Sequence, residues 1–173
     1  MIGLYLAVLA VAQPAHTLPP PSPGTPAVIE IRKADGSLAA RAMVWQGRSG
    51  LEVRVQAAGL PAGHYGVHLH EVGRCDGPAF ASAGGHWNPT GRQHGKLNPA
   101  GHHLGDLDNL DVDQSGAGRL EFTIPGAAAG GAGGLFDADG AALVIHVAPD
   151  DYRTDPSGNS GARIACGALV PAP

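Results

Sequence analysis

Glycine and proline interrupt this chain so often that short strands and turns are favoured over long helices. The 173 residues include 27 glycines and 15 prolines, which favour turns or end regular elements. Between the interruptions, apolar and polar residues alternate one by one. In the segment 51–57, Leu51, Val53 and Val55 point one way and the polar residues between them point the other. A period of two is typical of a β-strand with one wet face, so the sequence predicts an all-β fold.

Seven short segments carry this strand pattern, separated by turns. They are 27–32, 39–45, 51–57, 65–70, 118–124, 141–147 and 164–170. The length fits one domain with an ordinary core, and the 43% apolar and 15% charged residues suit a folded soluble protein. Because no segment has a convincing amphipathic helical pattern, we expect an antiparallel sandwich or barrel.

Two segments break the strand rhythm and are long for loops in a compact domain. One runs from Glu71 to about Asp111, and the other spans 148–162. Loops of this length need an internal fastening or are disordered. The first contains four of the nine histidines, a cysteine and several acids, which makes metal ligation the expected fastening. The Ala/Gly-rich stretch 127–134 predicts a flexible connection without a function.

The N-terminal residues have the features of an export signal. Residues 1–12 are almost wholly apolar, and Ala10-Val11-Ala12 fits the small-x-small pattern of a cleavage site. Residues 13–26 hold six prolines and predict a linker before a domain at 27–173. The alternative is a buried N-terminal strand or helix. The apolar run is too short to span a bilayer, so we expect a periplasmic or secreted protein.

Two cysteines, Cys75 and Cys166, are consistent with export. In an oxidising compartment they can close a loop of about 90 residues, which in the chain-entropy model stabilises a fold by up to roughly 4–5 kcal/mol. The alternative is a pair of unpaired buried thiols.

The formal net charge is −4. It gives no electrostatic support for a nucleic-acid or polyanion partner. An anionic substrate would have to be attracted by a local positive site.

Three histidines lie on segments predicted to be strands. His68 and His70 are two residues apart, so both point to one face while Val67 and Leu69 point to the other. A lone His-x-His pair more often lies on an exposed surface. His146, however, lies in the apolar strand 141–147, where a buried imidazole ring needs a partner for its polar nitrogens. Three imidazoles from two strands suit a borderline-soft metal such as copper.

The long loop carries a second set of candidate ligands. His103 and Asp106 are three residues apart and can chelate together across a turn, and His86 and His94 complete a set of three imidazoles and one carboxylate. Such a set suits a closed, structural zinc site. The alternative is a solvated histidine-rich loop. On composition alone, His102 competes with His103, whereas His16 in the linker and His64 in a turn are interpreted as bystanders.

Six blocks of the chain, in order across about residues 27–170, closely resemble the copper–zinc superoxide dismutase family. They are Gly66-Val67-His68-Leu69-His70-Glu71, Gly85-His86-Trp87-Asn88-Pro89, His94-Gly95, His103-Leu104-Gly105-Asp106-Leu107, Leu143-Val144-Ile145-His146 and Gly161-Ala162-Arg163-Ile164-Ala165-Cys166-Gly167. The resemblance is to the exported bacterial type. It implies an antiparallel Greek-key β-sandwich or flattened barrel of immunoglobulin-like architecture, with two long functional loops.

The resemblance also implies a role for each matched residue, and it selects His103 over His102. Copper would bind His68, His70, His86 and His146, and zinc would bind His86, His94, His103 and Asp106. Asp150 would hydrogen-bond a copper-bound and a zinc-bound histidine, Arg163 would attract the substrate anion, and Cys166 would be the second cysteine of the disulfide with Cys75. The implied reaction converts two superoxide ions and two protons to dioxygen and hydrogen peroxide by cycling between Cu(II) and Cu(I), with His86 bridging both metals and exchanging a proton.

Some positions depart from the family pattern, and some alternatives stay open. Tyr65 replaces a usual histidine and Val67 a usual phenylalanine, the loop after His146 lacks the lysine of the animal enzymes, and Arg153 either replaces that lysine or is simply solvated. The C-terminal residues differ from the tail through which the animal enzymes form dimers, so monomer and homodimer both remain open.

Two other functions are alternatives to the enzyme. A non-enzymatic copper or zinc module would need neither Arg163 nor Asp150, and a zinc hydrolase would need an open zinc position.

Overall fold

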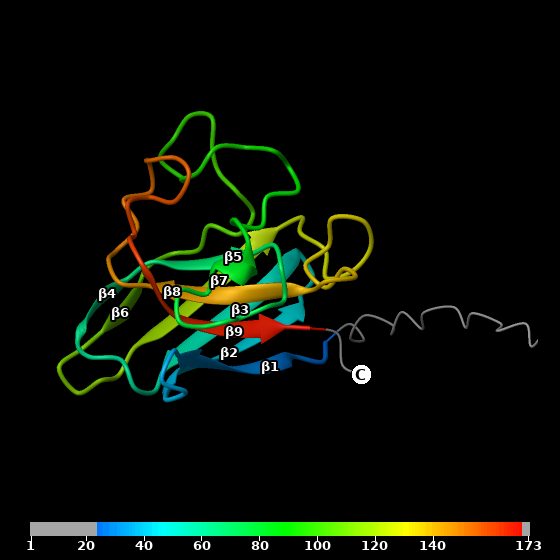
Figure 1. Cartoon of the computed structure of the whole chain (residues 1–173). Helices are drawn as coiled ribbons and strands as arrows, with labels where there is room; N and C mark the ends of the chain where they lie inside the picture. The colour runs from blue at the N-terminus through cyan, green and yellow to red at the C-terminus, as the bar shows by residue number, and fades with distance from the viewer. Residues whose placement is uncertain (1–23, 171–173) are drawn as a thin grey trace, which may run out of the picture.

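The alternating segments form β-strands that pair antiparallel throughout the described chain (Figure 1). The structure, a computed structural model, describes residues 24–170. The strands are β1 (Ala27–Lys33), β2 (Leu38–Gln46), β3 (Gly50–Ala57), β4 (Gly63–Tyr65), β5 (Val67–His70), β6 (Leu110–Val112), β7 (Arg119–Pro125), β8 (Ala141–His146) and β9 (Arg163–Leu169), with one short 3₁₀ turn, η1 (Ala81–Ala83).

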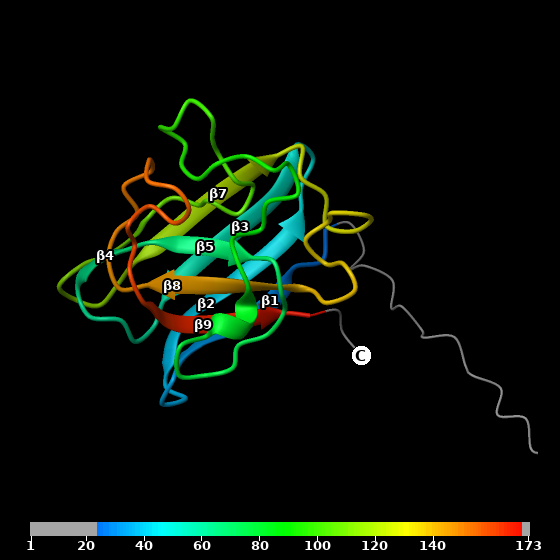
Figure 2. The same cartoon turned by 45° about the horizontal axis from the view of Figure 1, so that its top comes forward.

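The strands form a sheet that curls into a flattened barrel. Seven strands pair in the order β5-β8-β9-β1-β2-β3-β7, and β4 pairs with β6. Figure 2 shows β5, β8 and β9 crossing in front of β2, β3 and β7, so that the two halves of the sheet face each other. One residue separates β4 from β5, and a bridge between Val112 and Gly118 joins β6 to the start of β7. These links nearly close the barrel and confirm the predicted antiparallel sandwich or flattened barrel.

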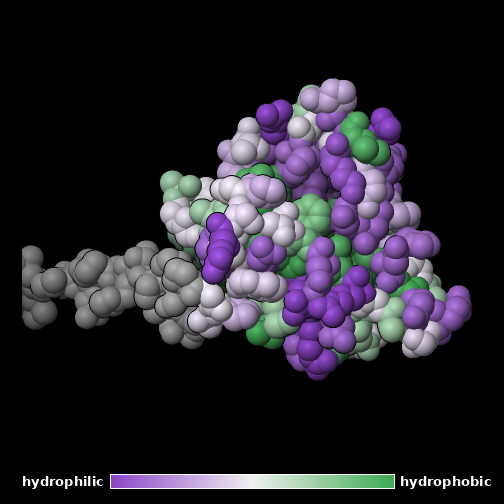
Figure 3. Space-filling model, turned by 180° about the vertical axis from the view of Figure 1, so that it is seen from behind, coloured by the Kyte–Doolittle hydropathy of each residue, from purple (hydrophilic) through white to green (hydrophobic). Residues whose placement is uncertain are grey.

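The core lies between the two halves of the curled sheet. Leu51, Val53 and Val55 are at most 1% exposed, as their alternation predicts, and they pack with Leu143 and Ile145 of β8 in one apolar cluster. The outer face of β1, β2, β3 and β7 carries charged residues that pair across strands. Seen from behind, the surface is accordingly largely hydrophilic, with smaller hydrophobic areas between (Figure 3).

Strand β8, which ends at the candidate ligand His146, is buried on both faces. Leu143 and Ile145 face the core, whereas Ala142 and Val144 pack under Phe80 and the disulfide in a second apolar cluster. The disulfide joins Cys75 to Cys166, with the two Cα atoms 5.6 Å apart. It therefore ties the start of the long loop to β9, as the resemblance predicts.

Three local features differ from the sequence-based expectation. The predicted strand 65–70 is interrupted at Gly66, and the long loop ends in β6 at Leu110 and contains η1, neither of which has a clear sequence period. The prediction of a flexible connection at 127–134 was wrong for Ala127 and Ala129. Both are buried in the core cluster, and the side chain of Gln46 hydrogen-bonds to the backbone of each.

The expected signal segment 1–12 and residues 13–23 of the expected linker lie outside the described residues. The first strand begins at Ala27, where the domain is expected to start. Within residues 24–170, no helix has the length and apolar character needed to cross a membrane.

Candidate metal centre

The site is built on β5, the edge strand of the large sheet, and on the long loop that follows it. The loop returns along β5 through backbone hydrogen bonds, with the N–H of Leu69 donating to the carbonyl of Gly105 and the N–H of Trp87 donating to the carbonyl of Leu69. These bonds cover an otherwise open sheet edge. They also place His86 opposite His70 and Asp106 opposite His68.

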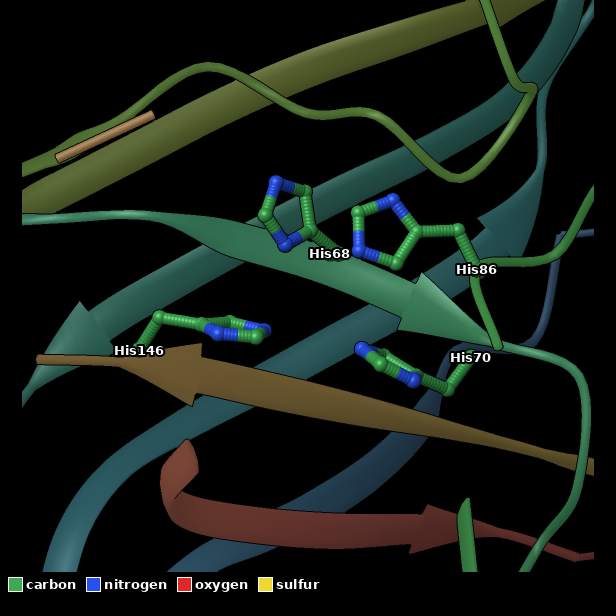
Figure 4. Close-up of side chains that lie close together, drawn as sticks. All are labelled: His68, His70, His86 and His146. Carbon is green, nitrogen blue, oxygen red and sulfur yellow. The ribbon is translucent and has the colours of Figure 1, made fainter. Parts of the chain in front are cut away.

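Four histidine rings converge on one space beside β5 and β8. Figure 4 shows His68 and His70 extending from β5, His146 from the end of β8 and His86 from the loop, each with a ring nitrogen turned toward the others. The ring centroids of His68 and His86 are 4.0 Å apart, and those of His70 and His86 are 5.0 Å apart. We call His68, His70, His86 and His146 the four-histidine cluster.

One nitrogen of each ring in this cluster has no hydrogen-bond partner although it is buried. These atoms are Nδ1 of His68 and Nε2 of His70, His86 and His146. In each case the other ring nitrogen is occupied: for example, Nδ1 of His70 lies 3.0 Å from the carbonyl of Gly84, and Nδ1 of His146 lies 3.0 Å from that of Gly161. Buried polar atoms without partners are costly. Four free imidazole nitrogens facing one space therefore fit a copper-type metal ion.

Burial keeps these rings neutral, which is the form that binds metals. Desolvation lowers the pKa of His68 to about 3, of His70 to about 2 and of His146 to about 4, and it also lowers the pKa of His86. At neutral pH the free nitrogens therefore carry lone pairs and no protons.

A second cluster shares His86 and consists of His86, His94, His103 and Asp106. Asp106 Oδ1 lies 2.9 Å from His86 Nδ1, 3.0 Å from His94 Nδ1 and 3.1 Å from His103 Nδ1, and the last atom is 3.4 Å from His86 Nδ1. Ligands about 2.0–2.1 Å from a tetrahedral zinc lie roughly 3.3 Å from one another. The donor set and its spacing fit zinc, and we call these residues the three-histidine–aspartate cluster.

The second cluster has the electrostatics of a cation site. Burial would raise the pKa of Asp106, but hydrogen bonds with His103, His86 and His94 outweigh it and hold the pKa far below the usual range. Burial would likewise lower the pKa of His94, but the carboxylates of Asp106 and Asp150 outweigh it and raise the pKa to about 9. Positive charge is thus favoured between the two carboxylates, whether a proton or a metal ion supplies it.

Asp150 connects the two clusters. Its Oδ2 lies 2.9 Å from His68 Nε2 and its Oδ1 lies 3.0 Å from His94 Nε2. Gly158 passes so close that a Cβ there would lie 1.8 Å from Asp150 Oδ1, and its φ of +61° also favours glycine. One buried carboxylate therefore orients a ring from each cluster, because a ring whose outer nitrogen is bonded presents its other nitrogen inward.

Arg163 lies at the start of β9 and is held by the loop that the disulfide ties down. Its two terminal nitrogens donate to the carbonyl oxygens of Phe80 at 2.7 Å and Gly84 at 2.6 Å. The Gly84 carbonyl is also the partner of His70 Nδ1. The guanidinium is therefore fixed next to a residue of the four-histidine cluster.

The structure brings together all seven predicted ligands, with Asp150 and Arg163 next to them, and it leaves out His64, one of the two histidines interpreted as bystanders. His102 lies beside the second cluster without joining it, because its Nδ1 faces the carbonyl of His103. His64 is exposed and pairs with Asp111, and His16 lies outside the described residues. Arg153 is exposed.

Sequence reasoning did not identify the groups that hydrogen-bond to the site residues from outside the two clusters. The carbonyls of Phe80, Gly84 and Gly161 and the side chain of Asn109 orient its members. A backbone carbonyl leaves no mark in a sequence, and Asn109 has no neighbour that signals its role.

Comparisons with known proteins agree with this geometry. The family model described as copper/zinc superoxide dismutase matches residues 39–169. Superoxide dismutase (Cu-Zn) 2 of Aquifex aeolicus is 42% identical over 143 residues, covering 81% of this chain and 84% of that protein. The superoxide dismutase-like protein YojM of Bacillus subtilis is 46% identical over 124 residues, covering 70% and 63%.

Solved structures show the same architecture. A crystal structure of a superoxide dismutase-like protein from Bacillus subtilis has a TM-score of 0.78 and 39% identity, covering 84% of this chain and 99% of that one. The Cu/Zn superoxide dismutase from Brucella abortus has a TM-score of 0.65 and 25% identity, covering 84% and 99%. Since the family model spans both clusters and the relatives align over most of the chain, this protein belongs to the copper/zinc superoxide dismutase family.

Proposed function

We propose that this protein is a superoxide dismutase that holds one copper and one zinc ion per chain. The observation that carries the proposal is His86, whose Nε2 is one of the free nitrogens of the four-histidine cluster while its Nδ1 belongs to the three-histidine–aspartate cluster. A ring placed in this way can serve two ions at once. Copper would bind the first cluster and zinc the second.

Copper supplies a metal that exchanges one electron at a time, and zinc, which has no redox chemistry, supplies structure. The chain's own residues would then handle the substrate and its protons. His86 Nε2 is the atom at which a proton would be taken up between the two half-reactions and given back to the peroxide product. The overall balance is two superoxide ions and two protons to one dioxygen and one hydrogen peroxide.

Arg163 would bind and orient the superoxide anion. The protein has a net charge of −4, so attraction of an anion depends on a local positive group. Two carbonyl oxygens hold the guanidinium in place without neutralising it. Its remaining N–H groups can face an anion beside the four-histidine cluster.

The disulfide is consistent with an oxidising compartment. Together with the apolar residues 1–12, it supports export to the periplasm or the medium. Monomer and homodimer remain alternatives, which sedimentation of the purified protein would distinguish.

Metal analysis combined with an activity assay tests the proposal directly. We expect about one copper and one zinc per purified chain, loss of superoxide dismutation when a chelator removes copper, and recovery when copper is added back. A protein that binds both ions but does not accelerate dismutation would instead be a metal-binding module. A protein that retains neither ion would contradict the proposed site.

Replacing Arg163 with alanine is expected to slow dismutation by about tenfold, because one positive charge near the reacting anion is removed. Both metals should remain bound, since Arg163 contributes no atom to either cluster. The rate of the variant should also depend less on ionic strength than that of the wild type. Arg41→Ala serves as the control, because it removes the same charge from an exposed position on the outer face of β2 that belongs to neither cluster. Equal rates for Arg163→Ala and the wild type would exclude Arg163 from the reaction.

A further inference from the structure

Tyr152 lies in the second long loop and contacts the first long loop at two separate places. Its carbonyl accepts a hydrogen bond from the N–H of Leu97 at 2.9 Å, and its phenolic oxygen accepts one from the N–H of Asn109 at 2.9 Å. Leu97 follows the zinc-ligand candidate His94 by three residues, and Asn109 follows Asp106 by three. One residue thus contacts both ends of the segment between His94 and Asn109, with its backbone carbonyl at one end and its side chain at the other.

The aromatic ring of Tyr152 also has a contact of its own. Lys96 Nζ lies 4.1 Å from the ring centroid and also pairs with Asp108, so a cation is fixed over the aromatic face. The residue has a φ of 62°, which is uncommon for an aromatic side chain and persists only where the surroundings impose it. Gly95 passes so near that a Cβ there would lie 2.2 Å from the carbonyl oxygen of Tyr152.

Tyr152 is also joined to Asp150, the carboxylate between the two clusters. Its N–H donates to Asp150 Oδ1 at 2.6 Å, the same oxygen that meets His94. The side-chain amide of Asn109 completes the arrangement, because its Oδ1 accepts from the N–H of Asp150 at 2.8 Å and its Nδ2 donates to the carbonyl of Asp150 at 3.0 Å. Asp150 is therefore fixed at its carboxylate and at both sides of its backbone.

We infer that Tyr152 is a positioning residue that holds the Asp150 carboxylate across His68 and His94, and thereby slows the loss of zinc. The inference rests on the proposed metal site and names a residue that determines its stability. Tyr152 touches neither cluster and acts through Asp150.

The test is the rate at which the holoenzyme loses zinc to an excess of chelator. Tyr152→Phe keeps the ring under Lys96 and removes the acceptor of the Asn109 N–H. We expect zinc release roughly three- to tenfold faster than in the wild type, the range set by one net hydrogen bond. The visible absorption of bound Cu(II) should also shift, because His68 shares the Asp150 carboxylate.

Tyr65→Phe is the matched control. Tyr65 lies in β4, and its hydroxyl donates to the carbonyl of Pro61 at 2.9 Å, within its own part of the chain. It also loses one hydroxyl hydrogen bond, so it reports the effect of such a loss away from the metal centre. Its zinc-release rate should stay within twofold of the wild-type rate, and its copper absorption spectrum should not shift.

A double-mutant cycle tests whether Tyr152 acts through Asp150. In an Asp150→Ala background the carboxylate is gone, so adding Tyr152→Phe should change the zinc-release rate by less than twofold. If the zinc-release rate of the double variant instead rises by the product of the two single-variant factors, Tyr152 stabilises the loop independently of Asp150 and the inference is overturned. A Tyr152→Phe rate equal to that of the wild type would also overturn it. A wild-type protein that binds no zinc would contradict the proposed function itself and the inference with it.

Discussion

Replacing His146 with alanine is expected to reduce copper-dependent dismutation by roughly a hundredfold or more. Even residues that only orient a metal ligand cost ten- to a hundredfold when they are mutated, and His146 Nε2 is one of four nitrogens that would hold the ion directly. Zinc should be retained, because His146 is not part of the three-histidine–aspartate cluster. Metal analysis and the dismutation rate of the same preparation measure the two outcomes.

His102→Ala is the control for this experiment. His102 is adjacent in sequence to the zinc-ligand candidate His103, but its ring faces a backbone carbonyl and it belongs to neither cluster. The same substitution there should leave copper content and activity close to the wild-type values. A His146→Ala protein with full activity would refute the assignment of copper to the four-histidine cluster.

The sequence predicts the strands well because their side chains face either a dry core or water. Residues 51–57 alternate strictly, and β3 forms there with its apolar residues inside. The same two-residue period places His68 and His70 on one face and Val67 and Leu69 in the core. Strand β8 has no alternation since loops cover its outer face, yet the length and apolar character of 141–147 were enough to identify it.

The loops could be predicted only where ligands mark them. His86, His94, His103 and Asp106 are recognisable as a donor set of zinc type, and the structure brings them together. The conformation that does so depends on backbone hydrogen bonds to β5 and on contacts such as those of Asn109 with Asp150. These partners are 41 residues apart, and no local pattern links them. The burial of Ala127 and Ala129 was missed for a similar reason, because small residues can either pad a core or form a mobile connection.

The disulfide links the stability of the fold to the geometry of the site. Cys75 and Cys166 lie in the apolar cluster that also contains Phe80 and Ala83, and this part of the loop supplies the carbonyls of Phe80 and Gly84 that hold Arg163. Arg163 itself is three residues before Cys166 on β9. The covalent bond therefore fixes both the arginine and the loop that orients it.

Replacing both cysteines with serine is expected to lower the free energy of unfolding by roughly 4–5 kcal/mol, because the bond closes a loop with a sequence separation of 91 residues. For a chain of this length such a loss corresponds to a melting temperature lower by roughly 10–20 °C. Thermal unfolding of the metal-free proteins measures the effect without a contribution from bound ions. The wild type in the presence of a reductant should approach the melting temperature of the double variant.

Activity separates the two roles of the bond. At a temperature where the metal-loaded double variant is still folded, dismutation should be slower than in the wild type and less dependent on ionic strength, since the loop that holds Arg163 is no longer anchored. Adding Arg163→Ala to the double variant should then reduce the dismutation rate by a smaller factor than the same substitution does in the wild type. If Arg163→Ala costs the same in both backgrounds, the disulfide stabilises the fold without positioning the arginine.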